Sequence, residues 1–150
     1  MTAKNLMSSD LVALKPTDTV ATAAESILQH HLRHLPVVDE RGRYLGTFGI
    51  YSVLQLTLPS AVLKQGLDNV AFVTETAHDL AQRLRKRQDE SVRNWVVQDP
   101  VVYPDTPAMK VLQIILRGHT SVPVVDKETG RLEGIISSWN VLEILMQERA

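Results

Sequence analysis

The sequence of 150 residues contains no cysteine, which excludes disulfides, thiolate catalysis and zinc–thiolate sites. Neither sign of charge dominates: with a formal net charge of -1, the chain has no overall field that would attract nucleic acid or an acidic membrane surface. No apolar run is long enough to span a bilayer, and the start, Met1–Asn5, lacks the apolar core of a signal peptide. A composition of 44% hydrophobic and 22% charged residues is ordinary for a soluble globular protein. Together with the lack of a signal peptide and of a membrane span, it leads us to expect a soluble cytoplasmic protein.

An internal repeat is the most informative feature that the sequence does have. The segment Leu35–Asp39 (LPVVD) returns as Val122–Asp126 (VPVVD), 87 positions later. Residues before this segment repeat at the same offset, and residues after it repeat at an offset of 88, so one residue is inserted in the following loop. The pairs are Asp18-Thr19 with Asp105-Thr106, Gly42-Arg43 with Gly130-Arg131, Gly46 with Gly134, and Val53-Leu54 with Val141-Leu142. Two copies of one supersecondary unit therefore make up most of the chain.

Each copy is predicted to run helix, strand, strand, helix. Thr19 can cap a helix whose apolar residues Val20, Ala23, Ala24, Ile27 and Leu28 follow helical spacing, and Thr106 can cap the matching helix with Pro107 at its first position. Because proline lacks a ladder donor, each first strand is predicted to begin at the repeated proline, Pro36 or Pro123. Turn residues then predict hairpins. The return strands and closing helices are expected at 43–48 and 51–57 in the first copy, and at 132–136 and 139–147 in the second.

An insert, residues 59–91, separates the two copies. It contains a short apolar run, Phe72-Val73. Thr76 and Asp79 then resemble a capping box that opens a helix over 77–88. This helix carries the basic run Arg83–Arg87, the one dense charge run in the sequence.

The order of these motifs resembles the cystathionine-β-synthase (CBS) domain. The shared pattern is a helix, then x-L-P-V-V-D, a hairpin, and G-φ-φ-S-x-x-N-φ-L, where φ is apolar; two copies in tandem resemble a Bateman module. Lys4–Met7 and Arg93–Val96 lie where the family has a short entry helix. The resemblance covers residues 3–58 and 92–148. It implies an α/β (α+β) fold of two CBS repeats, each a small sheet flanked by helices, packed in pseudo-two-fold fashion. The expected domains are 1–58, the insert 59–91, and 92–150.

The family resemblance implies a non-catalytic regulatory module. Family members bind adenine-containing ligands such as AMP, ADP, ATP or S-adenosylmethionine in clefts between two repeats, and they commonly form homodimers. No fused effector domain is expected, so we expect the output of the module to act in trans on a separate protein or through assembly. The proposed mechanism is a population shift, in which a ligand that bridges two repeats favours the orientation that closes on it.

In the family, each cleft combines the segment before P-V-V of one repeat with the G-φ-φ-[ST]-x-x-D segment of the other. Mapped onto this sequence, the preferred cleft consists of Leu32, Arg33, His34, Ser137, Trp139 and Asn140. The second, weaker cleft consists of His119, Thr120, Ser121, Gly49, Tyr51 and Ser52.

The two predicted clefts differ at the motif positions. Asn140 and Ser52 replace the family's aspartate, which accepts hydrogen bonds from the ribose hydroxyls. Asparagine offers one acceptor oxygen and no charge, so its bond to a ribose should be weaker. The motif serine survives as Ser137 but is Gly49 in the other copy. The cleft with Ser137 and Asn140 is therefore the better candidate, and the other is expected to be empty.

Three single motifs also allow other interpretations. His30, His31 and His34 could bind a metal, since His30 and His34 lie at i and i+4, but no third ligand is near and no metal site is predicted. The basic run Arg83–Arg87 could bind nucleic acid, dock a partner or form a solvated helix face. Trp139 and Tyr51 could stack on an adenine or serve packing or a dimer interface.

Two functional hypotheses therefore remain for the whole chain. Catalysis is not expected, because no nucleophile elbow or glycine-rich phosphate loop is present. The main hypothesis is a regulatory module that senses an adenine nucleotide. The alternative is a dimerisation or docking module with degenerate clefts and no physiological nucleotide.

Overall fold

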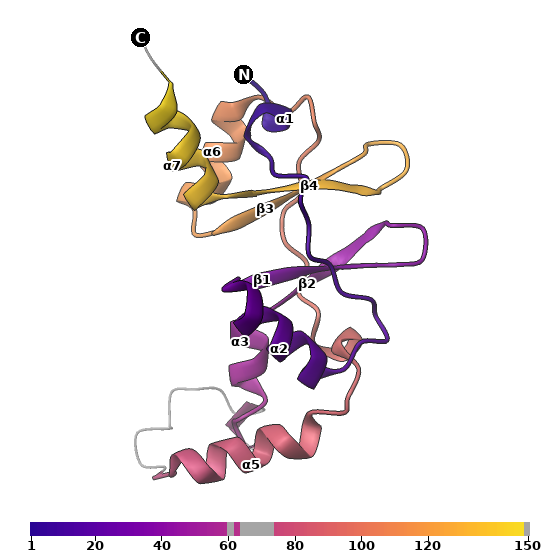
Figure 1. Cartoon of the computed structure of the whole chain (residues 1–150), viewed down its shortest axis with the longest axis vertical. Helices are drawn as coiled ribbons and strands as arrows, with labels where there is room; N and C mark the ends of the chain where they lie inside the picture. The colour runs from indigo at the N-terminus through magenta and orange to yellow at the C-terminus, as the bar shows by residue number, and fades with distance from the viewer. Residues whose placement is uncertain (60–61, 64–73, 149–150) are drawn as a thin grey trace. The chain divides into compact units, whose positions relative to one another are not determined.

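The computed structural model describes residues 1–59, 62–63 and 74–148. Helices and short strands alternate along the chain, as Figure 1 shows. In chain order the elements are α1 (Ala3–Leu6), α2 (Val20–His30), β1 (His34–Val38), β2 (Tyr44–Gly49), α3 (Ile50–Gln55), α5 (Ala77–Arg87), the 3₁₀ helix η2 (Val92–Trp95), α6 (Ala108–Leu116), β3 (Ser121–Val125), β4 (Leu132–Ser137) and α7 (Ser138–Gln147). The predicted sequence of helix, strand, strand and helix is confirmed in both repeats, and α1 and η2 are the two expected entry helices.

The chain divides into two compact units. Unit 1 consists of Met1–Lys15, Pro36–Thr47 and Val97–Ala150, and unit 2 consists of Pro16–Leu35 and Phe48–Val96. No helix in the described part of the chain is both long enough and apolar enough to cross a membrane.

Two small sheets carry the repeated motif. β1 and β2 form one sheet, and β3 and β4 form the other, in which the strands are antiparallel from the pair Ser121–Ser137 to the pair Val125–Leu132. The glycines that end the two hairpin turns have φ values of 79° (Gly42) and 75° (Gly130), which glycine adopts more readily than any other residue. The repeated glycines therefore close the two turns.

The two repeated prolines lie inside their strands, so the prediction that the strands begin there was wrong. β1 begins at His34 and β3 at Ser121. In unit 1, the Pro123 carbonyl accepts from the Val102 backbone N–H (3.0 Å), and the Pro36 carbonyl accepts from that of Leu14 (2.8 Å). The nitrogen and carbonyl of a strand residue face the same side. Each proline nitrogen therefore faces the segment that contains Leu14 or Val102, and not the partner strand of its hairpin. Each hairpin ladder therefore loses no donor to its proline.

The start of α6 also differs from the prediction. α6 begins at Ala108, with Pro107 as its cap residue. The Thr106 hydroxyl accepts instead from the Tyr103 backbone N–H (2.9 Å), within the turn that precedes the helix. A threonine before a proline can stabilise either the start of a helix or the preceding turn. Here Thr106 stabilises the turn.

Each unit has its own buried apolar side chains. In unit 1 the core cluster consists of Ala3, Leu6, Val102, Val111, Val122, Val124, Ile136 and Val141. In unit 2 the buried apolar residues are Val20, Ala23, Ile27, Leu35, Phe48, Leu56 and Val92. The predicted inner face of α2 is confirmed at Val20, Ala23 and Ile27, but Leu28, which was assigned to the same face, is 74% exposed.

The helix of the insert forms where the capping box predicts it. α5 begins after Thr76, whose hydroxyl accepts from the Asp79 backbone N–H (3.2 Å), while the Asp79 carboxylate accepts from the Thr76 backbone N–H (3.0 Å). No residue of α5 is fully buried. The apolar run Phe72-Val73 lies outside the described residues.

Candidate ligand-binding site

The segment before each repeated strand is hydrogen-bonded to the closing helix of its own repeat. In unit 2, the Arg33 carbonyl accepts from the Ile50 backbone N–H (2.9 Å). In unit 1, the Thr120 carbonyl accepts from the Ser138 backbone N–H (3.2 Å). The predicted site segments Leu32–His34 and His119–Ser121 are therefore fixed next to the first turn of a helix.

The second repeat presents open polar groups at the start of α7. The Ser137 hydroxyl accepts from the Asn140 backbone N–H (3.1 Å) and caps the helix. The half-buried side-chain amide of Asn140 makes no hydrogen bond within the described residues. Trp139 is 68% exposed beside it. This half of the preferred cleft thus offers a capped helix start, an available amide and an exposed ring.

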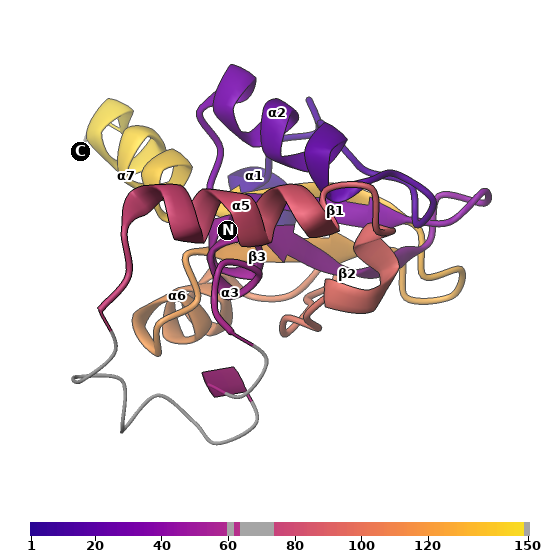
Figure 2. The same ribbon diagram turned by 90° about the horizontal axis from the view of Figure 1, so that it is seen from below.

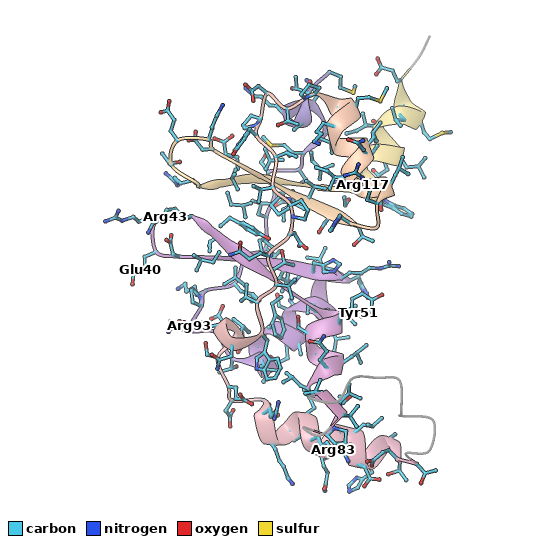
Figure 3. The ribbon with its side chains drawn as sticks, turned by 180° about the vertical axis from the view of Figure 1, so that it is seen from behind. Glu40, Arg43, Tyr51, Arg83, Arg93 and Arg117 are labelled. Atoms are coloured by element: carbon cyan, nitrogen blue, oxygen red, sulfur yellow. The ribbon has the colours of Figure 1, made fainter. Side chains whose placement is uncertain are left out.

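The first repeat is closed at the corresponding place. Ser52 is only 5% exposed, and its hydroxyl accepts from the Gly49 backbone N–H (3.3 Å). Tyr51 is 74% exposed and points outward from α3 (Figure 3). Because Tyr51 and Trp139 are both exposed, neither serves as core packing in its own unit. Both rings are therefore accessible for stacking on a ligand or for contact with another protein surface.

Gly49 is required by close packing and not by its backbone angles. Its φ of -140° and ψ of -174° describe ordinary extended backbone. A Cβ atom at Gly49 would lie 2.7 Å from the Arg33 carbonyl oxygen and 2.7 Å from Cδ2 of the His34 ring. The imidazole therefore occupies the space that a serine side chain would need. The second repeat has Ser121 and Ser137 at the positions of His34 and Gly49, so the two repeats divide this volume differently.

The aspartates at the ends of the repeated segments are turn residues. One carboxylate oxygen of Asp39 accepts from the backbone N–H groups of Arg41 and Arg43 (both 2.9 Å), and one of Asp126 accepts from those of Glu128 and Thr129 (2.9 and 2.8 Å). The backbone donor of Arg43 lowers the pKa of Asp39 below its ordinary value, and those of Thr129 and Glu128 lower the pKa of Asp126. These carboxylates stabilise the hairpins.

The three histidines of the first repeat do not share a helix face. α2 ends at His30, and His31 follows with φ 52° and ψ 41°, the left-handed conformation that ends a helix. His34 lies in β1, so the i, i+4 relation to His30 was wrong. The His30 ring is hydrogen-bonded to the Ser26 carbonyl (2.9 Å). Among the residues that the structure describes, no three histidines and acids are grouped as metal ligands.

His31 is in a conformation that glycine adopts more easily. Its counterpart at the offset of 87 is Gly118, with φ 111°. We expect His31→Gly to raise the free energy of unfolding by about 0.5–1 kcal/mol, because glycine removes the left-handed penalty but costs some chain entropy. Urea unfolding measures this change. Gly118→Ala is the matched control and should shift stability the other way; a destabilised His31→Gly variant would contradict the expectation.

The basic run of α5 divides into attached and exposed cations. The Arg83 guanidinium donates to the Thr57 carbonyl (3.2 Å) and pairs with Glu75. The Arg87 guanidinium lies 5.4 Å from the centre of the Trp95 ring and 3.7 Å from Glu90. Arg85 and Lys86 are exposed. Two of the cations therefore hold the helix to unit 2, which leaves too small a charge patch for strong nucleic-acid binding.

The CBS domain model matches residues 3–58 and 92–147. The chain belongs to the CBS domain family. This confirms the predicted family and accounts for the repeated hairpin with its flanking helices. The insert between the two matched segments lies outside both.

CBS-pair proteins are similar to this chain in sequence and in structure. CBS domain-containing protein CBSX1, chloroplastic, from Arabidopsis thaliana is 27% identical over 143 residues, which are 92% of this chain and 60% of that protein. The chain thus spans 60% of the length of this relative. The crystal structure of CBSX2 in complex with AMP is similar with a TM-score of 0.73 and 23% identity, over 97% of this chain and 96% of that chain. The CBS domain pair of protein MJ0100, in complex with 5′-methylthioadenosine and S-adenosyl-L-methionine, has a TM-score of 0.66 and 18% identity, over 99% and 98% of the two chains. These likenesses establish the fold of a CBS pair.

The two predicted clefts each combine residues of unit 2 with residues of unit 1. Leu32, Arg33 and His34 belong to unit 2, as do Gly49, Tyr51 and Ser52; the remaining predicted site residues belong to unit 1. The pairing of segments across the repeats stays a prediction. The exchange of His34 and Gly49 for Ser121 and Ser137 was not anticipated, although the offsets of 87 and 88 already aligned these positions.

Proposed function

We propose that this chain is a non-catalytic regulatory module that binds an adenine nucleotide of the AMP, ADP or ATP class. The preferred cleft joins Leu32–His34 to the start of α7, and occupancy changes the conformation or assembly of the module. The observation that carries the proposal is the open helix start in the second repeat, where Asn140 has an amide with no partner in the described chain. The AMP and S-adenosylmethionine complexes of similar CBS pairs support the ligand class.

The geometry of α7 suits a phosphorylated ligand. The backbone N–H groups of Ser138 and Asn140 are bonded to Thr120 and Ser137, whereas that of Trp139 has no partner within the described residues. A free N–H at the positive end of a ten-residue helix favours a phosphate oxygen. The Asn140 amide can accept from a ribose hydroxyl, and the Trp139 ring can stack on the base.

Assembly is part of the same proposal. Leu142, Leu145 and Met146 form an exposed apolar stripe along α7, which supports a homodimer or contact with a regulated partner. The same stripe also supports the alternative, a dimerisation or docking module without a nucleotide. The expected cytoplasmic location belongs to this proposal as well; of the relatives, CBSX1 is chloroplastic by name.

Calorimetric titration with AMP, ADP, ATP and S-adenosylmethionine tests the proposed function. At least one of them should give saturable binding, while uridine monophosphate, the matched non-adenine ligand, should not. Fluorescence titration of a Trp95→Phe variant isolates Trp139, whose exposed ring should change emission when the base stacks on it. If no adenine compound produces heat or an emission change, the sensing function is refuted and the docking alternative replaces it.

A further inference from the structure

The end of the insert caps the start of α2. The Glu90 carbonyl accepts from the Val20 backbone N–H and the Gln88 carbonyl from that of Ala21, both at 2.9 Å. The Thr19 hydroxyl accepts from the Thr22 N–H (3.1 Å). The first N–H groups of a helix have no partner within the helix. These contacts satisfy three N–H groups, and the insert supplies the acceptor for two of them.

Two further hydrogen bonds join the same segments. The Ser91 hydroxyl donates to the Pro16 carbonyl, and the Val92 backbone N–H donates to the Asp18 carbonyl (2.9 Å). We call these contacts between residues 16–22 and 88–92 the junction. Figures 1 and 2 show that the chain leaving α5 returns to the start of α2. The junction connects the insert to the first repeat.

The attachment of α5 is marginal, and it depends on two arginines. No residue of α5 is fully buried, and its leucines, Leu80 and Leu84, are only half-buried, so apolar packing holds it less firmly than a core helix. Arg83 binds the Thr57 carbonyl and Glu75, and Arg87 contacts Trp95 and Glu90. Glu90 itself provides one of the two carbonyls that cap α2. Release of the arginines would therefore loosen the junction.

α2 connects the junction to the proposed ligand segment. Its residues Val20, Ala23 and Ile27 are buried, so the helix is packed in unit 2 along most of its length. At its other end the Leu32 backbone N–H donates to the Ile27 carbonyl (3.1 Å). α2 and the hydrogen bond from Leu32 to its last turn therefore link the junction to the start of the segment Leu32–His34.

We propose that α5 regulates ligand binding through the junction and α2. The two states are α5 attached, with the Val20 and Ala21 N–H groups capped, and α5 detached, with these groups exposed to water. The attached state holds Leu32–His34 in the geometry that binds the nucleotide. By linkage, the nucleotide stabilises the attachment of α5, and a partner that displaces α5 weakens nucleotide binding. This inference rests on the proposed function and adds its regulation.

The test compares two double variants that remove the same charge. Arg83→Ala/Arg87→Ala removes the attachments, and Arg85→Ala/Lys86→Ala removes two exposed cations of the same helix. For the first variant we expect hydrogen exchange to be about tenfold faster in peptides covering 20–22 and 32–34, and AMP affinity to fall about threefold. The second variant should match the wild type in both measurements. Thr76→Ala, which removes the α5 cap, should reproduce the first variant without touching an arginine.

The outcomes separate the inference from the proposed function. If α5 exchanges faster in the first variant but residues 20–22 and 32–34 do not, the inference is overturned whatever the ligand. Equal effects of the two double variants would overturn it too, because loss of charge alone would then explain them. If the exchange changes as expected but the wild type binds no AMP, ADP, ATP or S-adenosylmethionine, the coupling stands and the proposed function fails.

Discussion

Replacing Gly49 with alanine is expected to lower the free energy of unfolding by about 1–3 kcal/mol, the usual cost of inserting a methyl group into a filled space. The new Cβ would lie 2.7 Å from the Arg33 carbonyl oxygen. This oxygen belongs to the backbone and already accepts from the Ile50 N–H, so it cannot turn away as a side chain could. At an extended position without such contacts, alanine for glycine would be stabilising. The sign of the change therefore tests the packing directly.

Urea unfolding of a set of variants separates the two obstacles at Gly49. His34→Ala/Gly49→Ala should recover part of the loss seen in Gly49→Ala relative to His34→Ala, because the ring is removed and the carbonyl remains. Gly134→Ala is a comparison in unit 1, where the obstacle is the Met7 side chain and its Sδ would lie 2.6 Å away. A Gly49→Ala variant as stable as the wild type would show that the first repeat has room for the motif serine.

Local chemistry explains what the sequence predicted well. The hairpins follow from Asp39 and Asp126, which bind backbone N–H groups of their own turns, and from glycines at positive φ. The capping residues Thr19 and Thr76 act on N–H groups three residues away. Such interactions depend on the order of residues along the chain, so a single sequence is enough to find them.

Tertiary partners explain what the sequence did not predict. The strands extend past Pro36 and Pro123 because each proline nitrogen faces an outer neighbour and not its hairpin partner, which no local pattern reveals. α2 ends before His34 because His31 adopts a left-handed conformation, and histidine is no strong signal for that. Only its alignment with Gly118 could have indicated the end of the helix.

The candidate site, too, was predicted where it depends on local sequence and missed where it depends on tertiary partners. The weaker status of the first-repeat cleft was predicted from the loss of the motif residues at Gly49 and Ser52. The structure shows that Ser52 is buried and that the His34 ring lies against Gly49, while the ranking of the two clefts stays a prediction. The capping of α2 by the carbonyls of Gln88 and Glu90 was missed, because backbone carbonyls carry no sequence signature.

Asn140→Asp is expected to strengthen AMP binding by about tenfold, which corresponds to about 1.4 kcal/mol. A carboxylate accepts with two oxygens and bears a charge, and charge-assisted hydrogen bonds are about twice as strong as neutral ones. The position suits the change, since the Asn140 side chain has no partner within the described residues and lies in the first turn of α7. Asn140→Ala should weaken binding about fivefold, because the ribose then loses its acceptor.

Ser52→Asp is the matched control for this gain of affinity. Ser52 holds the equivalent position of the first repeat, but it is 5% exposed and bonded to the Gly49 N–H. An aspartate there should lower stability and leave AMP affinity unchanged, because a buried carboxylate costs free energy and does not reach the ligand. Calorimetry measures the affinities of the three variants. Urea unfolding without ligand shows whether Asn140→Asp acts only by stabilising the helix start, where an acid is favourable in any case. If Ser52→Asp gains affinity and Asn140→Asp does not, the ligand is held by the first-repeat helix start, and the assignment of the preferred cleft is reversed.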